Sequence, residues 1–75
     1  MKISELQDKE IINIKDGKNL GRIVDLEIND KGEIINFFAI PKRTIFRLFL
    51  SNKETIFNIN NINKIGEDVI LVDLE

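Results

Sequence analysis

The sequence contains no cysteine and no histidine, and these two absences exclude much of enzyme chemistry. Without cysteine there is no disulfide framework, no thiolate metal site and no thiolate nucleophile. Without histidine the chain lacks the usual general base near neutral pH. Ser4 and Glu5 are adjacent, which does not suit a nucleophile and its base, so we expect Ser4 to cap a helical turn that packs Ile3 and Leu6 inward. We predict a protein that is not an enzyme and has no catalytic residues.

A calcium-binding loop is also missing. Asp25, Glu27 and Asn29 alternate like the first three ligands of such a loop, but Asp30 and Asn36 stand where it needs a glycine and a carboxylate. Alternation on the solvent face of a strand explains the same acids. We expect no metal site and no cofactor.

Long hydrophobic runs are absent as well. The uncharged run at residues 34–41 is eight residues long and that at residues 55–63 is nine, whereas a membrane-spanning helix needs about 20. The first ten residues are charged where a signal peptide needs an apolar stretch of about 7 to 15 residues. We therefore expect a cytoplasmic protein without a membrane span.

The chain has 75 residues, of which 43% are hydrophobic and 32% charged, as in soluble globular proteins. This length suits a single domain, residues 1–75. A domain of this size without disulfides depends on dense packing or on oligomerisation, so we expect a homodimer.

Turn signals recur between short apolar runs, which is typical of a small all-β sandwich or barrel. The turn signals are residues 16–17, 29–32, 41–42, 51–52 and 66–68. The runs between them predict strands at residues 10–15, 20–28, 34–40, 55–59 and 69–74. Isoleucines at every third position, Ile59, Ile62 and Ile65, predict one helical turn that lays all three against a barrel end.

The run at residues 20–28 alternates with a period of two residues. Four apolar side chains share one face in this pattern: Leu20, Val24, Leu26 and Ile28. We expect this face to point into the core, with Ile23 on the opposite face.

Positive charge is concentrated in one segment. Residues 34–53 carry four basic side chains and no acidic one, whereas the rest of the chain carries seven basic and thirteen acidic side chains. The segment also holds four of the five phenylalanines. Because the net charge of the chain is −2, broad binding to DNA is not expected.

Residues 42–50 can be interpreted in two ways. As a strand or hairpin, which the turn spacing favours, Phe46, Leu48 and Leu50 face the core while Ile45, Arg47 and Phe49 form an outer strip. As a short helix, the segment presents a basic amphipathic surface. Aromatic residues and arginine are enriched in protein interfaces. The candidate interface is therefore Lys42, Arg43, Ile45, Arg47 and Phe49, unless Arg47 only covers apolar neighbours at a barrel end.

The order of these features resembles the PRC-barrel domain, and in particular its YlmC/YmxH-type sporulation subgroup. The opening matches at Ser4, Glu5, Leu6, Lys9, Glu10, Gly17, Leu20, Gly21, Asp25 and Leu26. The ending matches at Ile62, Lys64, Ile65, Gly66, Asp68, Val69, Ile70, Val72 and Asp73. The resemblance implies a small SH3-like β-barrel of about five to six short antiparallel strands, with one short helical turn before the last strand.

The resemblance also implies a non-catalytic module that binds other macromolecules. We therefore predict a sporulation-associated protein that acts as a protein-interaction or adaptor module, with a partner that the sequence does not name. The alternative is binding of RNA or of an anionic membrane surface through residues 42–53, which would weaken steeply with salt. A structural scaffold without a ligand is a third possibility.

Overall fold

The computed structural model describes residues 1–41 and 54–74. In these residues the chain forms six strands, one short α-helix and one turn of 3-10 helix. In chain order these are α1 (Ile3–Gln7), β1 (Glu10–Asn13), β2 (Asn19–Ile28), β3 (Ile34–Ile40), β4 (Thr55–Asn58), η1 (Ile59–Asn61), β5 (Ile62–Ile65) and β6 (Val69–Val72). The all-β fold class that the sequence predicts is confirmed.

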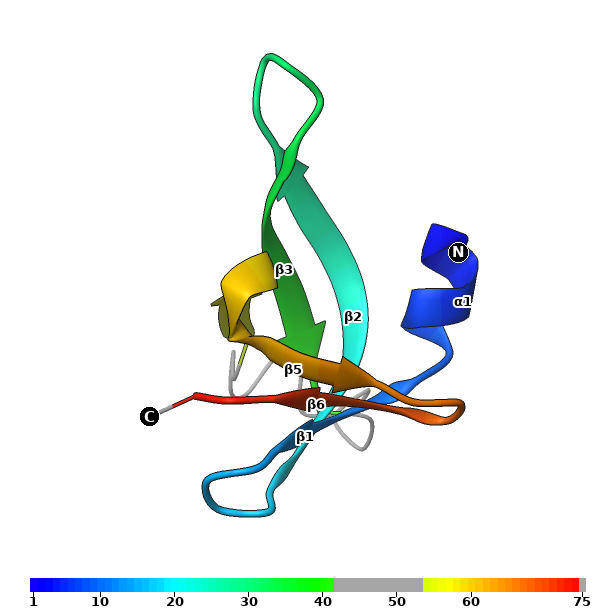
Figure 1. Cartoon of the computed structure of the whole chain (residues 1–75), viewed down its shortest axis with the longest axis vertical. Helices are drawn as coiled ribbons and strands as arrows, with labels where there is room; N and C mark the ends of the chain where they lie inside the picture. The colour runs from blue at the N-terminus through cyan, green and yellow to red at the C-terminus, as the bar shows by residue number, and fades with distance from the viewer. Residues whose placement is uncertain (42–53, 75) are drawn as a thin grey trace.

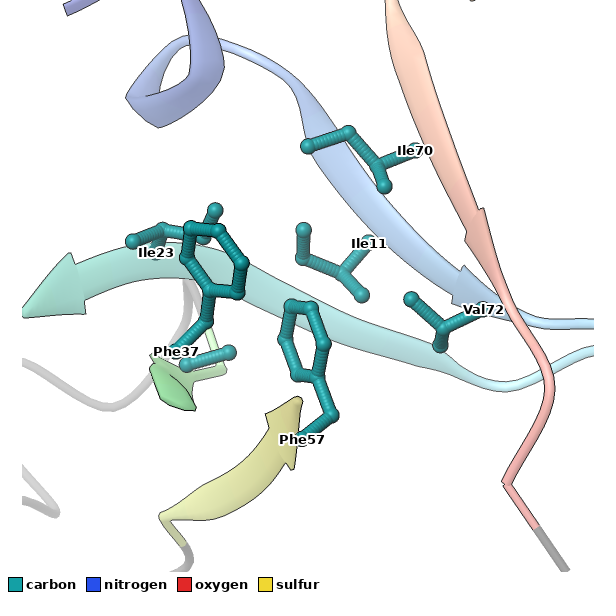
Figure 2. Close-up of a cluster of buried hydrophobic side chains, with 7 residues drawn as sticks. Ile11, Ile23, Phe37, Phe57, Ile70 and Val72 are labelled. Carbon is teal, nitrogen blue, oxygen red and sulfur yellow. The ribbon is translucent and has the colours of Figure 1, made fainter. Parts of the chain in front are cut away.

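The strands form one sheet in the order β4-β3-β2-β1-β6-β5. The sheet bends around a core, so that β4 and β6 approach it from different sides (Figures 1 and 2). Four of its pairings are antiparallel, as expected, but β1 pairs with β6 in parallel, in the register Ile11 with Ile70. Parallel neighbours need a long connection. Here the connection between β1 and β6 contains the other four described strands, β2, β3, β4 and β5.

The described residues contain one small cluster of buried apolar side chains. Its buried residues are Ile11, Ile23, Phe37, Ala39, Phe57, Ile70 and Val72, which come from β1, β2, β3, β4 and β6 (Figure 2). The rings of Phe37 and Phe57 stack with their centroids 5.3 Å apart. Each large side chain buried in this way stabilises the fold by about 1.5–3 kcal/mol. Leu6, at the end of α1, packs against the edge of the core, as predicted.

The predicted inner face of β2 is only partly correct. Ile23 is buried and Val24 is 44% exposed, the reverse of the prediction. The pairing with β3 passes from Ile23 opposite Ala39 to Asp25 opposite Phe38, so Val24 is an extra residue in a β-bulge. A second irregularity follows Glu27, and Ile28 is 56% exposed. The alternation of core-facing and solvent-facing side chains with a period of two residues does not continue across a bulge. Leu20 and Leu26 nevertheless pack against the core.

The predicted helical turn is shorter than expected. The η1 turn ends at Asn61, and residues from Ile62 onward form β5, so the turn precedes the last two strands. Asn58 caps η1, because its Oδ1 accepts hydrogen bonds from the backbone N–H groups of Asn60 and Asn61 at 2.8 and 3.2 Å. Ile62 packs against the core, whereas Ile59 and Ile65 are exposed, so only one of the three isoleucines lies as predicted.

The cap of α1 is also different from the prediction. The helix starts at Ile3, so Ser4 lies inside its first turn and does not precede it. Glu5 instead accepts a hydrogen bond from the backbone N–H of Lys2 at 3.1 Å, as in one half of a capping box. Ile3, expected to point inward, is 41% exposed.

The side chain of Asn13 connects the chain after β1 to the chain after β6. It is the buried polar residue of the described part of the chain, at 7% exposure. Its Oδ1 accepts hydrogen bonds from the backbone N–H groups of Lys15 and Leu74, both at 3.2 Å. One side chain therefore holds both the turn after β1 and the chain after β6.

Candidate interaction surface

The interface predicted from the sequence lies outside the described residues. Lys42, Arg43, Ile45, Arg47 and Phe49 all belong to residues 42–53. The structure does place the two ends of this segment. Ala39, near the end of β3, pairs with Thr55 at the start of β4, so the chain leaves and re-enters the sheet at neighbouring positions.

Exposed apolar side chains are the main feature of the described surface. Nine large ones are exposed, against the seven apolar residues that are buried. They are Met1, Ile3, Ile14, Val24, Ile28, Ile35, Ile56, Ile59 and Ile65. Single exposed apolar residues are normal, but several gathered at grooves mark interaction sites. Ile56 and Ile59, at 55% and 53% exposure, are among them and lie close in sequence on β4 and η1.

An open groove lies beside Ile56. Its lining residues are Lys15, Ile56, Asn60, Asn61, Asp73 and Leu74. Two hydrogen bonds fix the side opposite β4, from the Asp73 N–H to the Asn61 carbonyl at 2.8 Å and from Asn61 Nδ2 to the Asp73 carbonyl at 3.2 Å. Lys15 and Asp73 form a half-exposed ion pair at 3.6 Å. The groove thus has an apolar wall at β4 and a polar wall at the chain that follows β6.

A second groove lies on the other side of η1. It is lined by Asn29, Glu33, Ile34, Ile35, Asn36, Asn58, Ile59 and Asn60. The amide of Asn36 already donates to Glu27 Oε1, and that of Asn29 to Glu33 Oε1, both at 2.9 Å. Asn60 lines both grooves, so η1 is a ridge between them.

The backbone of β4 also faces the first groove. The N–H of Asn58 donates to Asn61 Oδ1 at 2.9 Å, so it points away from the paired strand β3. Along an antiparallel strand, residues whose backbone groups point outward alternate with residues bonded to the neighbour. The N–H and the carbonyl of Ile56 therefore also point away from β3. Among the described residues no strand pairs with this edge of β4, so the groove beside Ile56 contains a strand edge as well as an apolar side chain.

Other kinds of site find no support in the described residues. Residues 1–41 and 54–74 contain no group of three acidic side chains that could hold a metal ion. In the same residues no helix has the length and apolar character required to cross a membrane. Asp25, from the rejected calcium pattern, accepts a hydrogen bond from the Leu26 N–H. Asn29 Oδ1 accepts from the backbone N–H groups of Lys31 and Glu33 in the turn between β2 and β3.

Sequence reasoning identified a strand at residues 55–59 but missed the surface beside it. The signal that was available is the alternation in residues 55–58, where Phe57 is buried and Ile56 is exposed. Two apolar residues in succession do not show which one faces the core. The stacking of Phe57 on Phe37 decides this.

Comparison with known proteins agrees with the fold. The family model of the PRC-barrel domain matches residues 1–74. The chain is 41% identical over 73 residues to the probable sporulation protein YlmC of Bacillus subtilis (strain 168), covering 96% of this chain and 90% of that protein. It is 37% identical over 76 residues to the uncharacterized protein YmxH of the same strain, covering 99% and 89% of the two chains. The chain therefore belongs to the PRC-barrel domain family, and its fold is a small β-barrel.

Proposed function

We propose that this PRC-barrel protein is a non-enzymatic module that binds another protein through the apolar side chains around β4 and η1. The observation that carries the proposal is the exposure of Ile56 and Ile59 beside grooves; among residues 1–41 and 54–74, more large apolar side chains are exposed than buried. Apolar area of this kind is covered in protein interfaces, where polar residues form the rim. Lys15, Asn60 and Asp73 supply such a rim here.

We propose further that the module serves in sporulation. The support is the name of the relative YlmC, a probable sporulation protein, and the 41% identity over nearly the full length of both chains. An adaptor needs no catalytic residues, which agrees with a sequence that lacks histidine and cysteine.

The predicted interface at Lys42, Arg43, Ile45, Arg47 and Phe49 remains part of the proposal. Its segment begins and ends where β3 pairs with β4, at the strand that carries Ile56. The alternative of RNA or anionic-lipid binding rests on the same segment. It is tested by titrating the protein against RNA and anionic vesicles at low and high salt, because binding to phosphates weakens with salt whereas an apolar contact does not.

Photo-cross-linking in sporulating cells tests the binding surface. A photoreactive residue placed at Ile59 is expected to capture a defined protein, whereas the same residue at Lys31, in the exposed turn between β2 and β3, is not. Ile35→Ser, which removes an exposed apolar side chain beside Ile59, should reduce the capture. Equal capture at both positions, or none at either, would refute the proposed surface.

The proposed role in sporulation has a separate test. In a Bacillus subtilis strain that lacks its own YlmC, expression of this chain is expected to restore any loss of heat-resistant spores. The Ile56→Ser and Ile59→Ser double variant should restore fewer, at an equal protein level. If the double variant restores spores as well as the unchanged protein does, the apolar surface is not required for the role.

A further inference from the structure

We propose that the groove between β3 and η1, lined by Ile35 and Ile59, binds a peptide segment in which a lysine or arginine stands beside an aliphatic residue. This rests on the proposed function, since it names the chemistry of the partner bound at Ile59. The arguments are the position of the groove, the carboxylates that no cation neutralises and the unused side-chain amides.

The groove lies away from the points where residues 42–53 join the sheet. Its lining includes Ile35, near the start of β3, and Asn58, at the end of β4. Residues 42–53 connect the opposite ends of these two strands, where Ala39 pairs with Thr55. The extended strand from Ile35 to Ala39 spans about 13 Å. In Figure 1, η1 lies beside β3, below the long turn that joins β2 to β3.

The charge of this groove is not balanced within the described residues. The β2–β3 arm, residues 24–36, carries four acidic side chains and one basic one, and the basic residue, Lys31, does not line the groove. In the part of the chain that the structure describes, the one ion pair joins Lys15 to Asp73, which both line the other groove. Glu33, which lines the groove between β3 and η1, has no cationic partner in that part of the chain. Charge complementarity therefore favours a cationic occupant here.

Two asparagines hold carboxylates in place beside the groove. Asn29 Nδ2 donates to Glu33 Oε1, and Asn36 Nδ2 donates to Glu27 Oε1, both at 2.9 Å. Glu27 pairs with Asn36 and Asn36 pairs with Asn58, so Glu27 lies in one row with two lining residues. In residues 1–41 and 54–74, the Oε2 atoms of both glutamates accept no hydrogen bond. A lysine or arginine side chain can donate to these oxygens while the existing hydrogen bonds remain.

The other groups of the groove suit a peptide. Ile35 and Ile59 are 40% and 53% exposed, so an aliphatic side chain bound between them removes apolar area from water on both sides. The side-chain amide of Asn60 makes no hydrogen bond to another described residue, and it can both donate and accept, as a peptide backbone requires. A nucleic acid would not fit, because the same carboxylates repel its phosphates.

Selection from a library of random peptides displayed on phage, with the whole protein immobilised, tests the chemistry of the occupant. The enriched peptides are expected to carry lysine or arginine next to isoleucine, leucine or valine. Enrichment of acidic or uncharged peptides, or no enrichment at all, would overturn the proposal.

Fluorescence anisotropy with the most strongly enriched peptide measures the contribution of the groove. Glu33→Lys should raise the dissociation constant of the peptide at least about tenfold, because attraction is replaced by repulsion. Glu67→Lys, in the exposed turn between β5 and β6, is the matched control because it changes the net charge equally. It should change the dissociation constant less than about twofold at physiological salt. Equal effects of the two variants would mean that the peptide responds only to net charge, which contradicts a site at Glu33.

Nuclear magnetic resonance locates the peptide on the protein. On addition of the same peptide, the side-chain amide signals of Asn36 and Asn60 should shift, whereas that of Asn63, exposed on β5, should not. A shift at Asn63 without shifts at the groove would place the peptide elsewhere and overturn the inference. The proposed function is judged separately by capture at Ile59. If a protein is captured there and Glu33→Lys does not reduce the capture, the proposed function stands and the inference about charge is wrong.

Discussion

Replacing Gly21 by alanine should damage this fold more than its size suggests. Gly21 is buried in β2 and has a φ of 95°, which side chains other than hydrogen rarely tolerate. A Cβ added here would overlap the carbonyl carbon and oxygen of Ile40, and would lie 2.6 Å from the Cα of Pro41. The obstacle is backbone, so no side-chain rotation can relieve it.

The magnitude follows from two costs. The left-handed conformation costs about 1–2 kcal/mol for a residue with a Cβ. Moving β2 away from the end of β3 to make room costs a further 1–3 kcal/mol or so, as in other overpacked interiors. The free energy of unfolding should therefore fall by about 2–5 kcal/mol, which approaches the whole stability of a domain this small.

Urea unfolding followed by circular dichroism measures this difference. Gly17→Ala is the matched control, since Gly17 has a φ of 71° but nothing within 4 Å of its added Cβ. It should lose only the conformational part, about 1–2 kcal/mol. If the two variants lose the same free energy of unfolding, the close approach of Gly21 to Ile40 does not constrain the fold and the reasoning is refuted.

Three further outcomes can be measured on the same protein. In a double-mutant cycle of Phe37→Leu and Phe57→Leu, the stacked rings should show a coupling energy of about 0.5–1.5 kcal/mol, and strict additivity would contradict a specific ring contact. Asn13→Ala should lower the free energy of unfolding by about 1–3 kcal/mol and speed hydrogen exchange at the Leu74 amide, which loses its acceptor; unchanged exchange there would show that the bond is not formed. Arg22→Met should raise the melting temperature, because the buried Nε of Arg22 has no hydrogen-bond partner in the described part of the chain, and a lower melting temperature would show that this nitrogen is satisfied.

The strands could be predicted from the sequence because turn residues and apolar runs are local signals. The predicted strands at residues 10–15, 34–40, 55–59 and 69–74 each contain one of the observed strands, and the prediction at residues 20–28 misses only the first residue of β2, Asn19. Only β5 was absent from the prediction. Its four residues continue the isoleucine spacing of η1, and what makes them a strand is pairing with β6, a contact that the sequence does not display.

The faces of the strands were harder to predict than the strands themselves. Leu20 and Leu26 pack against the core as expected, but so does Ile23, because the register shifts at Leu20 in the pairing with β1 and again at Val24 in the pairing with β3. Whether a residue such as Val24 bulges depends on the register of the neighbouring strand. For the same reason Ile56 could not be recognised as exposed before the stacking of Phe57 was known.

The candidate site illustrates a different limit. A concentration of charge and phenylalanine directed attention to residues 42–53, which the structure does not describe. The grooves beside η1 are built from residues distant in sequence, such as Lys15, Ile56 and Asp73. No short segment of the sequence contains these residues together, so the groove can be recognised only in the folded structure.

The parallel pairing of β1 with β6 has a consequence for how the chain is made. The strand at residues 10–13 cannot complete its hydrogen bonding until residues 69–72 have left the ribosome. Nor can the core close earlier, because Ile70 and Val72 are among its buried members. During synthesis Ile11 therefore stays exposed until Ile70 and Val72 are available to pack against it. Contacts between residues so distant in sequence form slowly. We expect this barrel to fold only after translation of the domain is finished, with its apolar strands exposed to chaperones until then.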